Sequence, residues 1–193
     1  MSEPLITHIR KFVELTDEEA ALISSKLTLL KLKKKAFALT PGKTCRANYF
    51  VVKGCMRLYF INKKDTEQIT QFAIENWWVT DYDSVDSKKP SHFYIQAIED
   101  SEVLVLDQQT ETELIAQIPA FEHYLRLILQ KAFTAAQRRM EMIHNMTDEE
   151  RYRGFSSRFP DFTQRVPQYM VASYLGVTPQ FISRVRARRS KIS

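Results

Sequence analysis

The chain has 193 residues, of which 44% are hydrophobic and 11% aromatic, and its formal net charge is +5. This length suits one large or two small domains, and no apolar run approaches the roughly 20 residues of a membrane span. The first residues lack the apolar core of a signal peptide, so we expect a cytoplasmic protein without membrane contact. The chain has two cysteines, Cys45 and Cys55, which are not enough ligands for a zinc or iron–sulfur site. We expect both to be buried thiols.

The N-terminal part is predicted to begin with a helix and to continue as short strands. Thr16 and Glu19 form a predicted capping box, and apolar residues from Ala20 to Leu30 follow at helical spacing. Many short strands separated by turn residues are typical of an antiparallel barrel or double-sheet roll. After Lys31 we predict such strands at 49–52, 56–61, 68–74, 93–98 and 102–106.

A long helix is predicted at 121–144, directly after Pro119. Its apolar residues form one narrow stripe over several turns, consisting of Leu125, Leu129, Phe133, Ala136, Met140 and Ile143. Such a stripe suits the seam of a coiled-coil homodimer, while packing on the chain's own barrel is the alternative. Thr147 and Glu150 then form a second capping box, which starts a helix that ends near Pro160.

Positive charge is concentrated towards the C-terminal end. Residues 1–120 hold 15 Lys and Arg against 17 Asp and Glu, a net charge of −2. Residues 121–193 hold 13 against 6, a net charge of +7, and no acidic residue occurs after Asp161. This asymmetry favours a polyanionic partner for the C-terminal end, and a solvated basic tail is the alternative.

Residues 167–189 carry the pattern of a helix-turn-helix. Pro167 is suited to the first position of a helix, and Gly176 permits the positive φ of a tight turn. Thr178 is predicted to cap a second helix that begins with Pro179. The residues expected to point inward between the two helices are Val171, Ala172, Leu175, Val177, Ile182 and Val185.

The outward face of the second helix carries the candidate DNA contacts. Gln and Arg side chains read adenine and guanine edges in the major groove, while other basic residues hold phosphates. We predict double-stranded DNA as the partner, contacted by Thr178, Gln180, Ser183, Arg184, Arg186, Arg188 and Arg189. The alternative is a ligand-binding or protein-interaction module of the same fold, without specific DNA binding.

This order of elements resembles the cyclic-AMP receptor protein / fumarate-nitrate regulator (Crp/Fnr) family of bacterial transcription regulators. The resemblance covers nearly the whole chain and is most specific at 145–151 (Asn-Met-Thr-Asp-Glu-Glu-Arg) and 171–188. It implies an α+β fold in three parts. These are a cyclic-nucleotide-binding-like roll (a double-stranded β-helix) at 1–118, a dimerisation helix at 119–145 and a winged-helix-like domain with a reduced wing at 146–193.

The resemblance also has implications for partners and for base reading. It implies a homodimer on DNA, with RNA polymerase as a further candidate partner. By position, Gln180 and Arg184 match base-reading positions of the family. Pro179 stands where the family usually has a basic residue, so the preferred DNA sequence need not be the family's usual one.

The same resemblance argues against cyclic AMP as an effector. Members that bind cyclic nucleotides use a Gly-Glu pair for the ribose and an arginine for the cyclic phosphate. Glu75 is in place here, but Ile74 stands at the glycine position and Ser91 at the arginine position. No arginine lies between Arg57 and Arg126, and a buried phosphate without a cation is unfavourable.

The roll also carries residues suited to a pocket for a different effector. Candidate pocket residues are Glu75, Trp77, Trp78, Ser91 and His92, and packing of a degenerate roll is the alternative reading. The four histidines are too scattered to suggest a haem pair, and we predict no cofactor. The chain has no glycine-rich phosphate loop, metal-spaced His/Glu set or nucleophile elbow, so we predict that it is not an enzyme.

Overall fold

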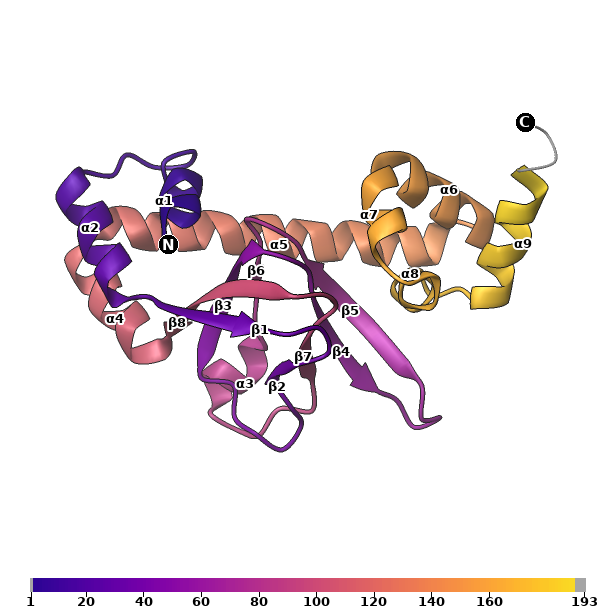
Figure 1. The fold of residues 1–193 in the computed structure, drawn as a ribbon, viewed down its shortest axis with the longest axis horizontal. Coiled ribbons are helices and arrows are strands. Elements are labelled where there is room, and N and C mark those ends of the chain that lie inside the picture. The colour runs from indigo at the N-terminus through magenta and orange to yellow at the C-terminus, as the bar shows by residue number, and fades with distance from the viewer. Residues whose placement is uncertain (1, 190–193) are drawn as a thin grey trace. The chain divides into compact units, whose positions relative to one another are not determined.

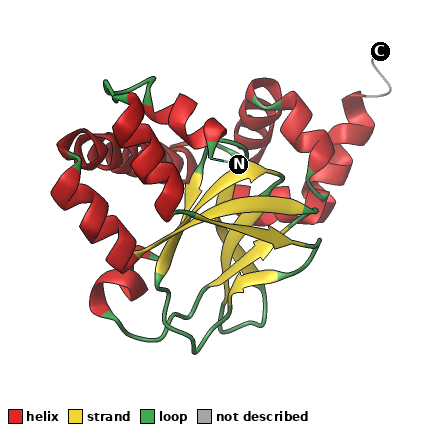
Figure 2. Ribbon diagram, turned by 60° about the vertical axis from the view of Figure 1, so that its left-hand side comes forward, coloured by secondary structure: helices red, strands yellow, loops and turns green. Residues whose placement is uncertain are grey.

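The computed structural model describes residues 2–189, apart from the side chains of Arg188 and Arg189. Helices and antiparallel strands form a mixed α and β structure, as expected from the sequence (Figures 1 and 2). The chain divides into two compact units. The roll unit comprises Met1–Ile61 and Thr70–Gln130, and the helical unit comprises Asn62–Ile69 and Lys131–Ser193.

Two four-stranded sheets form the framework of the roll. One has the order β1-β8-β3-β6, with β1 at Thr28–Leu32, β3 at Ala47–Lys53, β6 at Trp78–Val79 and β8 at Ser101–Asp107. The other has the order β2-β7-β4-β5, with β2 at Phe37–Leu39, β4 at Met56–Ile61, β5 at Glu67–Ala73 and β7 at Tyr94–Ala97. Each of the five predicted strands is therefore confirmed to within two residues at either end.

An apolar cluster that draws on both sheets fills the roll. The strands alternate inward and outward side chains, so every second residue of β3 and β4 reaches this core. Its buried members include Tyr49, Val51, Met56, Leu58, Ile95, Ala97 and Val103. Both predicted buried thiols are confirmed, with Cys45 and Cys55 at most 2% exposed.

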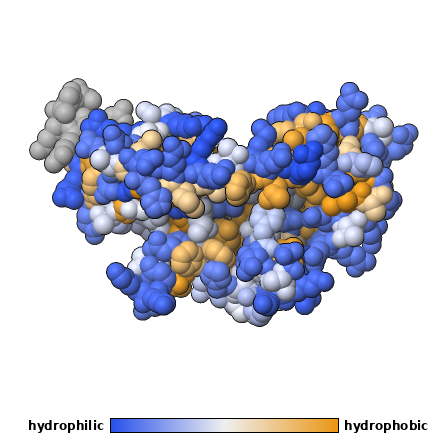
Figure 3. Space-filling view, turned by 180° about the vertical axis from the view of Figure 1, so that it is seen from behind, coloured by the Kyte–Doolittle hydropathy of each residue, from blue (hydrophilic) through white to orange (hydrophobic). Residues whose placement is uncertain are grey.

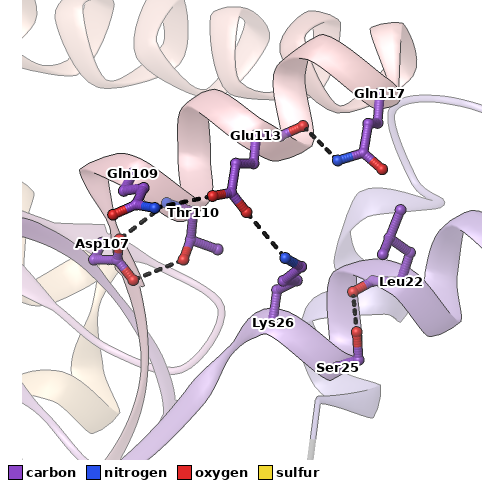
Figure 4. Close-up of polar contacts among 8 residues, drawn as sticks. All are labelled: Leu22, Ser25, Lys26, Asp107, Gln109, Thr110, Glu113 and Gln117. Atoms are coloured by element: carbon purple, nitrogen blue, oxygen red, sulfur yellow. Dashed lines mark hydrogen bonds and ion pairs between the residues drawn. The ribbon is translucent and has the colours of Figure 1, made fainter.

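Helices α1 (Glu3–Ile9), α2 (Asp17–Lys26) and α4 (Gln108–Gln117) pack around a second apolar cluster of the roll unit. Thr16 and Glu19 form the predicted capping box at the start of α2. Lys26 and Glu113 join α2 to α4 through an ion pair of 2.9 Å (Figure 4). The prediction that this first helix continues to Leu30 is wrong, because residues 28–32 pair instead with β8.

The remaining helices include the longest one in the described chain. Helix α3 spans Tyr82–Ser87 and α5 spans Pro119–Asn145, which confirms the predicted long helix. The helical unit continues with α6 (Asp148–Arg158), α7 (Pro160–Arg165), α8 (Gln168–Leu175) and α9 (Pro179–Arg189). Within residues 2–189, none of these helices is long and apolar enough to cross a membrane.

Candidate nucleic-acid interface

Helices α8 and α9 form a helix-turn-helix around Gly176. Gly176 adopts φ +68°, and its backbone N–H donates to carbonyl groups of the last turn of α8. Thr178 caps α9, because its Oγ1 accepts a hydrogen bond of 3.1 Å from the backbone of Phe181. Pro167 is the N-cap of α8 and not its first residue, so the helix begins at Gln168, one position later than the sequence suggested.

Small and aliphatic side chains hold the two helices together. Val171, Ala172, Leu175 and Ile182 are all at most 2% exposed, while Val185 is half-buried. A small residue at 172 lets the two backbones approach closely, so α9 lies against α8 with its opposite face free. The apolar pattern read from the sequence thus sets which face of α9 is presented to solvent.

Polar and basic residues occupy that exposed face of α9. Gln180, Ser183, Arg184 and Arg186 are exposed, and Gln180 and Arg184 lie one helical turn apart. This spacing puts both side chains on the same side of the helix. Arg188 and Arg189 were also predicted to contact DNA, but their side chains lie outside the described residues.

A polar bridge connects the start of α8 with the first turn of α9. Gln168 Nε2 donates to the carbonyl oxygen of Pro179 at 3.0 Å and to Oγ of Ser183 at 2.8 Å. Ser183 Oγ in turn donates to the same Pro179 oxygen at 3.1 Å. The sequence patterns did not single out Gln168, since a polar residue at a helix start gives no signal of its partner.

Arg139 of α5 supports the C-terminal end of α8. Its Nη2 donates to the carbonyl oxygen of Tyr174 at 2.8 Å and to that of Ile69 at 3.0 Å. The guanidinium carbon also lies 4.5 Å from the centre of the Tyr174 ring. Burial lowers the pKa of Arg139 below its ordinary value, and the nearby Tyr174 partly offsets this effect.

The segment Asn62–Ile69 belongs to the same unit as the helix-turn-helix. Ser173 of α8 accepts a hydrogen bond of 3.0 Å from the backbone N–H of Ile69 and donates one of 2.7 Å to the carbonyl oxygen of Glu67. Its hydroxyl therefore completes the hydrogen bonds of an exposed strand edge. The sequence patterns placed this segment in the roll alone, because nothing within the segment indicates a contact with Ser173.

An aromatic cluster joins α6, α7 and α8 within the helical unit. The ring of Phe155 in α6 lies 5.3 to 5.8 Å from the rings of Phe159, Phe162 and Tyr174. The capping box predicted at the start of α6 is present, with hydrogen bonds between Thr147 and Glu150. The sequence patterns did not predict helix α7, which carries Phe162, because they assigned Pro160 only to the end of the preceding helix.

Apolar side chains of α5 are exposed along the stripe predicted to be a seam. Phe133 and Met140 are each 63% exposed, and Leu129 is 48% exposed. Leu125 and Ile143 are half-buried and Ala136 is exposed. The space-filling view from behind likewise shows apolar residues at the surface among hydrophilic ones (Figure 3). Large apolar side chains left exposed in a row mark an interaction surface.

The five candidate effector residues make their contacts with different partners. Glu75 accepts a hydrogen bond of 2.9 Å from the backbone N–H of Gly54, and Trp78 Nε1 donates to the hydroxyl of Tyr124 at 2.9 Å. Trp77 is 47% exposed, and exposed His92 packs on the ring of Phe93. These interactions anchor the roll locally, each with a different partner.

Ser91, at the position aligned with the phosphate-binding arginine, is paired with an acid. Its hydroxyl donates to Oδ2 of Asp81 at 2.6 Å, and both residues are at most 5% exposed. Asp81 also caps α3 by accepting from the backbone of Ser84. A phosphate brought to Ser91 would meet a carboxylate and not a cation, which is electrostatically unfavourable.

Comparison with known proteins agrees with this architecture. Residues 29–118 match the family described as the cyclic nucleotide-binding domain. The chain is 25% identical over 174 residues to the anaerobic regulatory protein of Haemophilus influenzae, which covers 83% of the chain and 66% of that protein. It is 26% identical over 163 residues to the fumarate and nitrate reduction regulatory protein of Escherichia coli strain K12, with coverages of 78% and 64%.

Solved structures provide the corresponding match in three dimensions. The structure of FixK2 from Bradyrhizobium japonicum superposes with a TM-score of 0.71 at 16% identity, and the match covers 86% of this chain and 85% of that one. At this identity the match supports the fold. In sequence, the chain spans about two thirds of the length of the curated relatives.

Proposed function

We propose that this chain, which belongs to the Crp/Fnr family of regulators, is a bacterial transcription regulator that binds double-stranded DNA as a homodimer. The observation that carries the proposal is the helix-turn-helix of α8 and α9. Its apolar residues are buried, and Gln180, Ser183 and Arg184 are exposed on the free face of α9. An exposed Gln and Arg one turn apart are suited to base edges in the major groove.

Charge supports DNA as the partner. Residues 121–193 carry a net charge of +7, against −2 for residues 1–120. Lys and Arg side chains release condensed counterions when they neutralise phosphates, which gives affinity without sequence preference. In our proposal Arg186, Arg188 and Arg189 supply this contribution, whereas Gln180, Ser183 and Arg184 read bases.

The exposed stripe of α5 supports the homodimer. A second copy of the same stripe would cover Leu129, Phe133 and Met140, whose exposed fractions are between 48% and 63%. Two helix-turn-helix motifs related by a two-fold axis would then bind half-sites about one DNA turn apart, roughly 34 Å, or a multiple of it. RNA polymerase is the further partner we propose, and the cytoplasm is the compartment where the protein would act.

The roll would act as a sensor or scaffold and not as an enzyme. Its relatives named above are regulatory proteins. The hydrogen bond between Ser91 and Asp81 argues against an anionic cyclic phosphate as the effector. We therefore propose a regulator without bound cofactor, whose effector, if it has one, is not cyclic AMP.

A selection of bound duplexes from random DNA tests the proposed function. The full chain should enrich a near-palindromic sequence, and its affinity for that duplex should fall steeply as salt rises, because phosphate contacts release counterions. A protein-interaction module would enrich no sequence. Equal binding to selected and scrambled duplexes would contradict specific DNA recognition, and absence of a salt dependence would contradict DNA binding altogether.

A further inference from the structure

The bridge between Gln168 and Ser183 has a defined hydrogen-bond polarity. The carbonyl oxygen of Pro179 is only an acceptor, so the group of Gln168 that lies 3.0 Å from it must be the NH₂ and not the oxygen. The two hydrogens of that NH₂ are directed to the Pro179 oxygen and to Ser183 Oγ. Oγ of Ser183 therefore accepts a hydrogen bond from Gln168.

The single hydrogen of the Ser183 hydroxyl is also directed inward. Oγ of Ser183 lies 3.1 Å from the Pro179 oxygen and donates to it. A hydroxyl has one hydrogen and two lone pairs, of which one lone pair here accepts from Gln168. What remains for an external partner is the second lone pair, so exposed Ser183 presents an acceptor to solvent.

In the major groove an acceptor distinguishes two bases from the other two. Adenine and cytosine present amino groups there, at N6 and N4, whereas guanine and thymine present O6, N7 and O4 acceptors. A serine free to rotate satisfies either class, since it can donate or accept. Ser183 held in its present orientation pairs with the amino-bearing bases only.

We propose that Gln168 is a positioning residue that fixes the polarity of the Ser183 hydroxyl, so that α9 selects adenine or cytosine at the base that Ser183 faces. This inference rests on the proposed function and adds one base preference per half-site to it. Gln168 reaches Ser183 from the start of α8, so it acts through Ser183 and does not itself need to contact a base.

Selections from random duplexes with the wild type, Ser183→Ala and Gln168→Ala test the proposal. The position that loses its preference in Ser183→Ala is the one Ser183 faces, and the wild type should accept only adenine or cytosine there. In Gln168→Ala the Ser183 side chain loses one of the two hydrogen bonds that hold Oγ beside the Pro179 oxygen, so it can turn outward and donate. Guanine and thymine should then also be accepted at that position. All other positions should keep their preferences. Gln164→Ala, which removes an exposed glutamine of α7, is the matched control.

Binding to a duplex with a base analogue gives a second measurement. A purely structural role of Gln168 in packing the helices would not change its result. Replacing the selected adenine by purine, or the selected cytosine by its analogue without the amino group, removes the donor and should weaken wild-type binding roughly fivefold to tenfold. Binding by Ser183→Ala should not change. A wild-type preference for guanine or thymine at that position, or an unchanged preference in Gln168→Ala, overturns the inference. Failure of the wild type to enrich any sequence overturns the proposed function itself.

Discussion

Tyr49 and Tyr124 are buried phenols of the roll unit, and both are held in their neutral form. Burial raises the pKa of Tyr49 from 10 to about 12, and burial also raises the pKa of Tyr124. Tyr124 joins three elements, since its hydroxyl accepts from Trp78 and lies 2.8 Å from Nδ1 of His8. Removing a proton from either phenol would place a charge in an apolar cluster.

The raised pKa of Tyr49 predicts a loss of stability at high pH. Between pH 10 and 12 the unfolded chain releases the Tyr49 proton while the folded chain keeps it, so the free energy of unfolding falls as pH rises. The contribution of this group should be at most about 1.4 kcal/mol per pH unit. Urea unfolding at several pH values measures it. Tyr49→Phe should have a shallower dependence, and an identical dependence would contradict the assignment.

Arg184 and Arg186 are both exposed on α9 but are expected to act differently on DNA. Arg184→Ala should cost about 1–3 kcal/mol on the preferred duplex and relax the preference at one position per half-site. Arg186→Ala should weaken all duplexes alike and reduce the salt dependence by about one ion per subunit. Titrations on preferred and scrambled duplexes compare them. Equal weakening of both duplexes by Arg184→Ala would exclude base reading by that residue.

At the scale of elements, α5 is amphipathic but leaves its apolar stripe exposed over the middle of its length. Residues 131–138 are all exposed, including Phe133. Helices of this length derive their stability from packing an apolar face and not from propensity alone. A second copy of the chain would provide that packing for α5.

Replacing Phe133 and Met140 by Glu should therefore convert the proposed dimer into monomers. Each new carboxylate would face its copy in the second chain across the seam, in an apolar environment. Sedimentation at micromolar concentration provides the measurement. Ala135→Glu combined with Arg138→Gln changes the net charge equally on the opposite side of the helix and should leave the dimer intact. A dimer that persists in the seam variant would place the interface elsewhere.

The turn between α8 and α9 depends on the backbone freedom of one glycine. Gly176 has φ +68°, and a Cβ built on it would meet no atom within 4 Å, so substitution there strains only the backbone. Gly176→Ala should destabilise the helical unit by about 1 kcal/mol. Gly154→Ala, in α6 with equally open surroundings, should instead stabilise it by about 0.5–1 kcal/mol. Thermal unfolding of the two variants should shift in opposite directions.

At the scale of the whole molecule, the chain divides into two units that contain different elements. The roll unit holds both sheets' apolar cluster and the pair of Ser91 with Asp81. The helical unit combines the helix-turn-helix with Asn62–Ile69, although this segment is more than 60 residues away in sequence. A sensing function and a DNA-binding function would therefore rest on separate cores.

Cyclic AMP should not stabilise the protein. A ligand present at about 100 times its Kd raises the free energy of unfolding by about 2.7 kcal/mol, which thermal unfolding detects readily. We expect no such shift with cyclic AMP. Ser91 is hydrogen-bonded to the carboxylate of Asp81, which would repel the cyclic phosphate. Duplex DNA in the same assay is the positive control. A shift with cyclic AMP would contradict this prediction and would point to Lys88 and Lys89 as phosphate partners.

Local sequence patterns determined a large part of this protein. The capping boxes at Thr16 and Thr147 and the turn at Gly176 were predictable because their partners lie within a few residues. Periodicity predicted α5 and the strands of the roll in the same way, since it depends only on which face is apolar. The basic C-terminal end predicts a polyanionic partner, and the element order indicates the resemblance to the Crp/Fnr family.

Only the tertiary structure decided the contacts between residues distant in sequence. The bonds of Ser173 to Glu67 and Ile69, and of Arg139 to Ile69, join segments 70 or more residues apart, and no local pattern encodes such a pairing. The bond between Gln168 and Ser183 depends on how α8 crosses α9. Leu30 fits a helix by spacing alone, but pairing with β8 satisfies its backbone groups as a strand. The physical reason is that hydrogen-bond partners and burial are set by packing, which sequence spacing specifies only within a single element.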